Sequence, residues 1–175
     1  MVIIYDCETS THGRINPNKN KLKLFGYINT KNGKLQILRY RQKALIRKVL
    51  ESNEDKVGFY NTRYDNVVLR NEGYKINGRI IDLHHAVKAK KHEMGFLPGE
   101  KLSLDNSAKR IGMQLSKGSI DYAWLDDDKL IKKHRKEIYK YLDIDLILTL
   151  GIFNHFEEYV LAQAKLKEAL LQSIS

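Results

Sequence analysis

The sequence predicts an α/β fold in which helices cover a mixed sheet. Asn32 and Gly33 separate two strand-like segments, 23–29 and 34–41, and Asn-Gly between such segments is a strong signal for a hairpin turn. The later strand-like segments alternate with helical patterns, as parallel strands do. We therefore expect five strands, with an antiparallel hairpin at one side of the sheet and parallel strands after it.

Local patterns place the elements in chain order. Residues 2–9 open with β-branched and aromatic side chains typical of a buried strand, and apolar residues at helical spacing predict a helix over 42–52. A loop rich in lysine and glycine is expected over 88–101. The remaining expected elements are a strand over 56–61, a short helix over 64–74, a strand beginning at 78, a helix between an N-cap at Ser103 and a stop at Gly112, and a long helix or helix pair over 128–171.

Length and composition indicate one folded domain over residues 1–175. The hydrophobic fraction is 42%, and no linker rich in proline, glycine or serine divides the chain. The 31 basic and 21 acidic residues give a net charge of +10, which favours a polyanion such as nucleic acid or an anionic membrane face. A general bias toward lysine is the plainer explanation of the same charge.

The cellular setting expected from the sequence is the cytoplasm. Cys7 is the one cysteine, so no internal disulfide can form, which suits a reducing compartment. No signal peptide is recognisable, and the most apolar stretch, around 144–153, is too short to span a bilayer. We expect a soluble protein without a membrane partner.

Two acidic residues end the first predicted strand, in the stretch VIIYDCETS. Asp6 and Glu8 are two residues apart, so both side chains point to the same face of the sheet and Cys7 points to the other. Carboxylates this close repel one another unless a cation lies between them, and Mg²⁺ prefers oxygen ligands. The alternative is a frayed strand end with solvated acids.

Two further aspartates lie on predicted helices. Asp65 stands at the start of the helix over 64–74, where it is either a site residue or an N-cap. Asp145 lies within the apolar stripe of the long helix, one turn after Tyr141, so it points inward and needs a partner. Asp143 leans toward solvent beside Lys136 and Lys140. A buried aspartate bonded to a backbone or hydroxyl group is the alternative for Asp145.

Together these acids predict a centre for phosphodiester hydrolysis. Four carboxylates can converge at one edge of the sheet, and two divalent ions held by carboxylates are a known arrangement for that reaction. A basic surface would then offset the repulsion between an acidic site and an anionic substrate. The residues concerned are Asp6, Glu8, Asp65 and Asp145.

The acidic residues belong to three short motifs, Asp6-Cys7-Glu8-Thr9, Asn61-Thr62-Arg63-Tyr64-Asp65, and Tyr141-Leu142-Asp143-Ile144-Asp145. These motifs resemble those of the DEDD superfamily of 3′→5′ exonucleases, which have a ribonuclease H-like fold. Nearly the whole chain is covered, with the motifs in the expected order. The third motif has the tyrosine form and so resembles the branch found as the proofreading domain of DNA polymerases. Tyr139 with Asp143 also satisfies the third pattern, and only the helix-face argument favours Tyr141 with Asp145.

The resemblance implies a stand-alone nuclease domain. Its four carboxylates would hold two Mg²⁺ or Mn²⁺ ions, and Tyr141 would orient the attacking water. Thr9, Asn61 and Tyr64 would lie beside the terminal nucleotides of a single-stranded 3′ end. The products would be nucleoside 5′-monophosphates.

Other functions stay open at this stage. The chain could be a nucleic-acid-binding module or accessory subunit with weak or no catalysis, or a ribonuclease H-like endonuclease. Replication or repair proteins are conceivable partners that the sequence does not identify, and it does not separate DNA from RNA as substrate. Basic stretches at 39–48, 88–92 and 129–136 are candidate phosphate contacts, or simply solvated surface.

Overall fold

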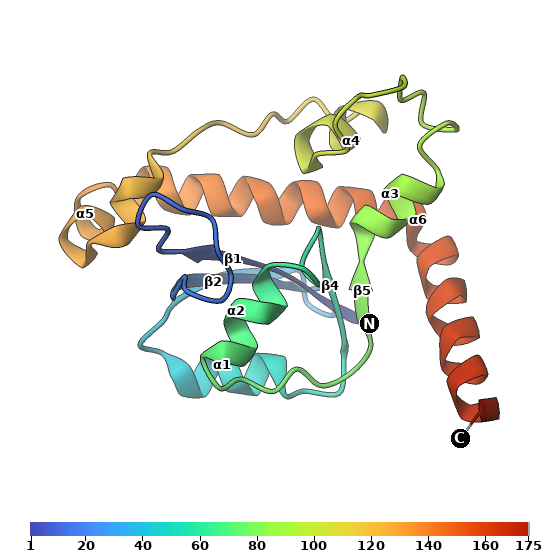
Figure 1. Cartoon of the computed structure of the whole chain (residues 1–175), viewed down its shortest axis with the longest axis horizontal. Helices are drawn as coiled ribbons and strands as arrows, with labels where there is room; N and C mark the ends of the chain where they lie inside the picture. Colours follow the sequence, from blue (N-terminus) through green and yellow to red (C-terminus); the bar gives the residue numbers. More distant parts are fainter. Residues whose placement is uncertain (175) are drawn as a thin grey trace.

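The computed structural model describes residues 1–174, with side chains up to residue 167, so Ser175, the end of the predicted domain, lies outside the described residues. A five-stranded sheet lies between helices (Figure 1). The strands are β1 (Val2–Thr9), β2 (Leu22–Asn29), β3 (Lys34–Arg39), β4 (Asp55–Gly58) and β5 (Ile80–Asp82). The helices are α1 (Lys43–Leu50), α2 (Asp65–Asn71), α3 (Leu83–Ala89), α4 (Leu104–Arg110), η1 (Tyr122–Asp126, a 3₁₀ helix), α5 (Asp128–Lys133) and α6 (Arg135–Ile174).

The sheet is mixed, as the hairpin signal and the alternating pattern predict. Its strand order is β3-β2-β1-β4-β5. β2 pairs antiparallel with both β1 and β3, whereas β4 is parallel to β1 and β5 is parallel to β4. β1 is therefore the central strand, and its carboxyl end lies in the middle of the sheet edge, where α/β folds build sites.

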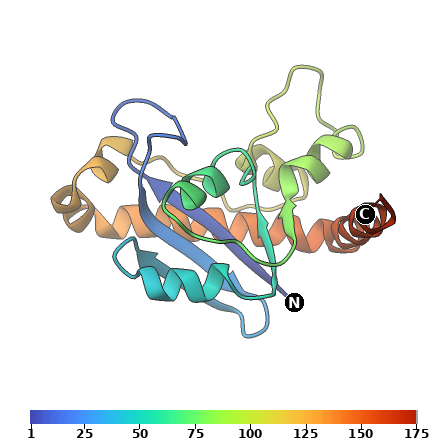
Figure 2. The ribbon, with the colours of Figure 1, turned by 60° about the horizontal axis from the view of Figure 1, so that its bottom comes forward.

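The two faces of the sheet are covered differently. The long helix α6 crosses one face, and α1 and α2 cover the other (Figure 2). Alternation along β1 follows this division: Ile3, Tyr5 and Cys7 pack with α1 and α2, while Val2 and Ile4 pack under α6. Asp6 and Glu8 therefore share the α6 face, and Cys7 faces away from it, as the sequence predicts.

Two helical segments add to the order of elements expected from the sequence. Residues 83–89 form α3 directly after β5, so the loop expected from Lys88 begins later. The Asp82 side chain accepts a hydrogen bond from the His84 backbone N–H, and this N-cap lets the helix start without an intervening turn. The second is η1, in the polar stretch before α5. The predicted helix pair over 128–171 is confirmed as α5 and α6, whereas β4 ends at Gly58, three residues early.

Helix α6 is 40 residues long, and its C-terminal part continues beyond the sheet (Figure 1). No helix among residues 1–174 combines the length and apolar character needed to cross a membrane. The N-terminal half of α6 packs on β1 and β2 and supplies much of the core on that face of the sheet.

Close packing between α6 and the sheet depends on Gly26. This glycine of β2 lies directly opposite Asp6 on β1. A Cβ atom at Gly26 would lie 2.8 Å from Leu146 Cδ1 and 2.9 Å from Leu142 Cγ, closer than carbon atoms tolerate. The missing side chain thus lets α6 approach β1 and β2 next to Asp6.

We expect Gly26→Ala to destabilise the protein by about 1–3 kcal/mol, because the added methyl group overpacks the contact with α6. The measurement is the free energy of unfolding in urea. Gly118→Ala is the matched control, since a Cβ there meets nothing within 4 Å. Equal stability of the two variants would contradict a tight helix–sheet contact at Gly26.

Candidate active site

A pocket of about 340 Å³ opens at the carboxyl end of β1. Its walls come from β1, the loops after β1 and β4, the start of α2, the starts of α4 and η1 with the segment between these two helices, and α6. The lining residues are Asp6, Cys7, Glu8, Thr9, Thr11, Ile15, Phe59, Tyr60, Tyr64, Asp65, Leu104, Lys117, Tyr122, Tyr141 and Asp145. Most site residues expected from the sequence are among them.

Three carboxylates meet in this pocket. Asp6 and Glu8 come from β1 and Asp145 from α6, and one oxygen of each lies within 4.8 Å of the other two. Glu8 is 5% exposed and Asp145 2% exposed, so Asp145 points inward as its helix face predicts. The alternation of β1 and the inward stripe of α6 together produce the cluster.

Asp65 lines the same pocket but is not part of the three-carboxylate cluster. It is the first residue of α2 and is buried. The N-cap position of α2 belongs to Tyr64, and no side-chain hydrogen bond caps that helix, so the N-cap alternative for Asp65 is not supported. Burial, followed by repulsion from Asp6, raises the pKa of Asp65 well above its ordinary value.

The carboxylates are poorly stabilised as anions. Burial, followed by the Asp145 carboxylate, raises the pKa of Asp6 to about 7. Burial, followed by the carboxylates of Asp6 and Asp145, raises the pKa of Glu8 well above its ordinary value. Burial also raises the pKa of Asp145. Asp145 Oδ1 is buried without a hydrogen-bond partner among the described residues. This set of hard oxygen donors fits a divalent cation, which would relieve the repulsion.

Lys117 supplies the positive charge at this site, and sequence reasoning missed it. Its Nζ lies 2.5 Å from Asp145 Oδ2 and 4.3 Å from the centre of the Tyr141 ring. Burial favours a lower pKa for Lys117, but Asp145, Asp6 and Glu8 outweigh it and the pKa is raised. Lys117 lies in an irregular segment without periodicity, so no local pattern marked it.

Tyr141 projects into the pocket beside Asp145. Its hydroxyl group lies 2.8 Å from the Tyr122 hydroxyl group. Burial, then the hydrogen bond with Tyr122 and the Asp145 charge, raises the pKa of Tyr141 well above its ordinary value. The other candidate pair, Tyr139 and Asp143, does not line the pocket. Asp143 is half-buried, and this burial raises the pKa of its carboxyl group.

The three residues expected beside a nucleotide are placed differently. Thr9 and Tyr64 line the pocket, and their hydroxyl oxygens lie 2.7 Å apart, with Asn20 Nδ2 donating to the Tyr64 hydroxyl at 2.6 Å. Asn61 is fully buried, does not line the pocket, and donates to the Tyr5 hydroxyl at 2.7 Å. Of the three residues, Asn61 is the one that does not reach the pocket, because its side chain points from the loop after β4 toward the interior.

Comparison with known proteins identifies the fold through structure. No model of a protein family matches the sequence, and no curated protein is detectably similar to it. The structure resembles the nuclease NrnC of Brucella melitensis, described with bound Mg²⁺, with a TM-score of 0.62 and 16% identity over 98% of this chain and 80% of that one. The ribonuclease H-like fold expected from the motifs agrees with this likeness.

Exonuclease I of E. coli is also similar. Its complex with single-stranded DNA, described as a zinc-bound form, has a TM-score of 0.54 and 16% identity, over 80% of this chain and 42% of that one. A second complex of the same enzyme, with a dA16 oligonucleotide, has a TM-score of 0.50. At this identity the likeness establishes the fold, and the activity has to be argued from the pocket.

Divalent cations are expected to stabilise the protein. Mg²⁺ at about a hundred times its dissociation constant contributes roughly 2.7 kcal/mol, which raises Tm by about 5–10 °C for a chain of this size. Thermal unfolding with Mg²⁺ and with EDTA measures the shift. Asp145→Asn should remove most of it, and Asp143→Asn, on the same helix but outside the pocket, should keep it. An equal Mg²⁺-induced shift of Tm in both variants would contradict metal binding by Asp145.

Lys117→Met should lower Tm in EDTA more than in saturating Mg²⁺. Without the ammonium group, Asp145 faces Asp6 and Glu8 with no counter-charge, and the metal ion restores one. Lys109→Met is the control, because Lys109 pairs with Asp105 at the surface and its loss should be small and the same in both buffers. A loss of Tm by Lys117→Met that is independent of Mg²⁺ would contradict a shared role of lysine and metal.

Proposed function

We propose that residues 1–175 form a metal-dependent 3′→5′ exonuclease of the tyrosine branch of the DEDD superfamily, acting on single-stranded ends of DNA or RNA. The observation that carries the proposal is the cluster of Asp6, Glu8 and Asp145 inside a pocket that also holds Asp65 and Tyr141. The likeness in fold to nucleases, one of them described with bound Mg²⁺, supports it.

The four carboxylates would hold two Mg²⁺ or Mn²⁺ ions. Such ions, when bound, supply the Lewis acidity and positive charge that hydrolysis of a phosphodiester requires. Glu8 and Asp145 are buried and come from rigid elements, so the ligand positions are set before substrate arrives. Lys117 adds a cation at the same place and reduces the repulsion of an incoming phosphate.

Tyr141 would orient the attacking water. Its raised pKa keeps the phenol protonated at neutral pH, so it acts as a hydrogen-bonding group and not as a base. The contact with Tyr122 holds the hydroxyl group in the pocket. Thr9 and Tyr64, whose hydroxyl groups are tied together, would form the wall beside the terminal nucleotide. Asn61 would act indirectly, by holding the loop that precedes Asp65.

The surface charge is consistent with a nucleic-acid substrate. The net charge of +10 coexists with an acidic pocket, so the positive charge is displaced to the rest of the surface. The basic stretches lie at the end of β3 and on α1, at the end of α3, and over α5 and the start of α6. Charge at these places attracts a phosphate backbone without blocking the carboxylates.

The test is digestion of short 5′-labelled oligonucleotides of single-stranded DNA, duplex DNA and RNA with Mg²⁺ and with Mn²⁺. We expect a ladder that shortens from the 3′ end and releases nucleoside 5′-monophosphates. Asp6→Asn and Asp145→Asn should each lower the rate at least about a thousand-fold, because several kcal/mol of transition-state stabilisation is lost.

Asp143→Asn is the matched control and should retain activity. Internal fragments in place of a ladder would indicate a ribonuclease H-like endonuclease. Binding without degradation would indicate a nucleic-acid-binding module. Either result would overturn the proposed exonuclease.

A further inference from the structure

Tyr60 adopts a backbone conformation that is unfavourable for its side chain. Its φ is +63°, in the left-handed region, and it shares this feature with only His12 among the non-glycine residues that the structure describes. A bulky side chain in this region crowds its own backbone, so the conformation persists only where the surroundings impose it. Tyr60 lies two residues after the end of β4 and five residues before Asp65.

The Asp82 carboxylate imposes this conformation. Asp82 Oδ1 accepts from the backbone N–H of Tyr60 at 2.8 Å, and Oδ2 accepts from the N–H of Thr62 at 3.2 Å and from its hydroxyl group at 2.6 Å. Oδ1 also accepts from the N–H of His84 and so caps α3. One buried carboxylate thus binds the loop after β4 to the end of β5, whatever side chain stands at position 60.

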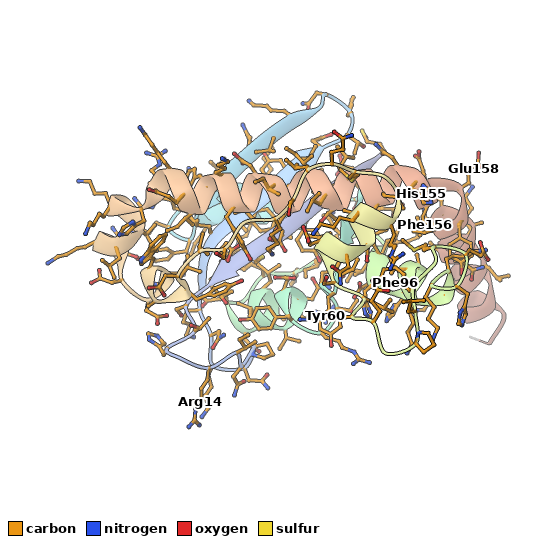
Figure 3. All side chains as sticks on the ribbon, turned by 90° about the horizontal axis from the view of Figure 1, so that it is seen from above. Arg14, Tyr60, Phe96, His155, Phe156 and Glu158 are labelled. Carbon is orange, nitrogen blue, oxygen red and sulfur yellow. The ribbon has the colours of Figure 1, made fainter. Side chains whose placement is uncertain are left out.

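The strained residue, Tyr60, is not part of the hydrophobic core. The Tyr60 side chain is 42% exposed, and it lines the same pocket as Asp6 and Asp65. Figure 3 shows Tyr60 beside α2. Its ring meets the His84 ring at nearly a right angle, with centroids 4.9 Å apart, and the Arg63 guanidinium lies over the Tyr60 ring, 5.9 Å from its centre. A planar ring is therefore held at the pocket wall, partly open to solvent, with a cation over one of its faces.

We propose that Tyr60 is a stacking platform for a nucleobase near the 3′ end of the bound strand, with Arg63 as the cation for an adjacent phosphate. This inference rests on the proposed function, since it places the substrate in the same pocket. A ring presented to solvent beside a cation matches how single-stranded nucleic acids are held, by base–aromatic stacking that tolerates any sequence. A base still paired in a duplex cannot stack in this way, so the platform favours unpaired ends.

The first experiment separates stacking from folding. Tyr60→Asn removes the ring but suits the left-handed conformation, so its Tm should be no lower than that of the wild type. Binding of a fluorescent single-stranded oligonucleotide in EDTA, which prevents hydrolysis, should weaken about 5- to 100-fold by loss of stacking. Tyr60→Phe keeps the ring and should bind like the wild type.

Tyr159→Asn is the matched control. Tyr159 also has a neighbouring cation, Lys90, 5.2 Å from its ring centre, but it lies on α6 away from the pocket. The same change from ring to amide there should leave the dissociation constant unchanged. If Tyr60→Asn binds like the wild type, or if Tyr60→Phe binds as weakly as Tyr60→Asn, the platform is excluded.

A second experiment identifies the partner of the ring. Oligonucleotides carry one abasic residue at the last, second-last or third-last position from the 3′ end. At one of these positions the missing base should weaken binding to the wild type but not to Tyr60→Asn, because each change removes the same contact. Effects that add at all three positions would overturn the inference.

The two proposals fail in different ways. If the wild type degrades no nucleic acid with Mg²⁺ or Mn²⁺ yet shows this coupling, the exonuclease proposal fails and Tyr60 remains a base contact. If the wild type degrades single strands but the effects add, the exonuclease proposal stands and the inference about Tyr60 fails.

Discussion

The close approach of α6 to the sheet at Gly26 is the constraint on which the candidate site depends. Gly26 lies opposite Asp6, and the Leu142 and Leu146 side chains of α6 occupy the space that a larger residue would fill. One turn along the helix from Leu142, Asp145 is thereby brought within reach of Asp6 and Glu8. Apolar packing between helix and strand thus sets the spacing of the carboxylates, although no acid takes part in that packing.

Packing that brings the acidic side chains together also creates electrostatic repulsion between them, and Lys117 from an irregular segment reduces this repulsion. Burial and mutual repulsion raise the pKa values of Asp6, Glu8 and Asp65, so the cluster is unfavourable without positive charge. Lys117 supplies part of this charge through its ion pair with Asp145. Asp145 Oδ1, which has no hydrogen-bond partner among the described residues, can contact a further cation. A cluster of this kind favours a bound cation, because the positive charge offsets the repulsion between the carboxylates.

The loop after β4 is held by contacts with β1 and with the end of β5. Asn61 turns inward to the Tyr5 hydroxyl, which donates in turn to Asn66, so the interior under α2 holds one end of this loop. Asp82 holds the other side of the loop through the N–H groups of Tyr60 and Thr62. Buried polar groups with several hydrogen-bond partners fix the loop, and these hydrogen bonds offset the cost of the strained backbone at Tyr60.

Local pattern alone determined the order of the strands and of the helices other than α3 and η1, the shared face of Asp6 and Glu8, and the inward side of Asp145. These follow from periodicities of two and 3.6 residues, which act between near neighbours. Tertiary structure alone decided that Lys117 enters the acidic pocket, that Asn61 is buried and that Tyr60 is held in a strained conformation. Lys56 is a similar case, a strand lysine that is fully buried and donates to three backbone carbonyls. Irregular segments and single polar contacts have no repeat in the sequence, because partners distant along the chain fix their positions.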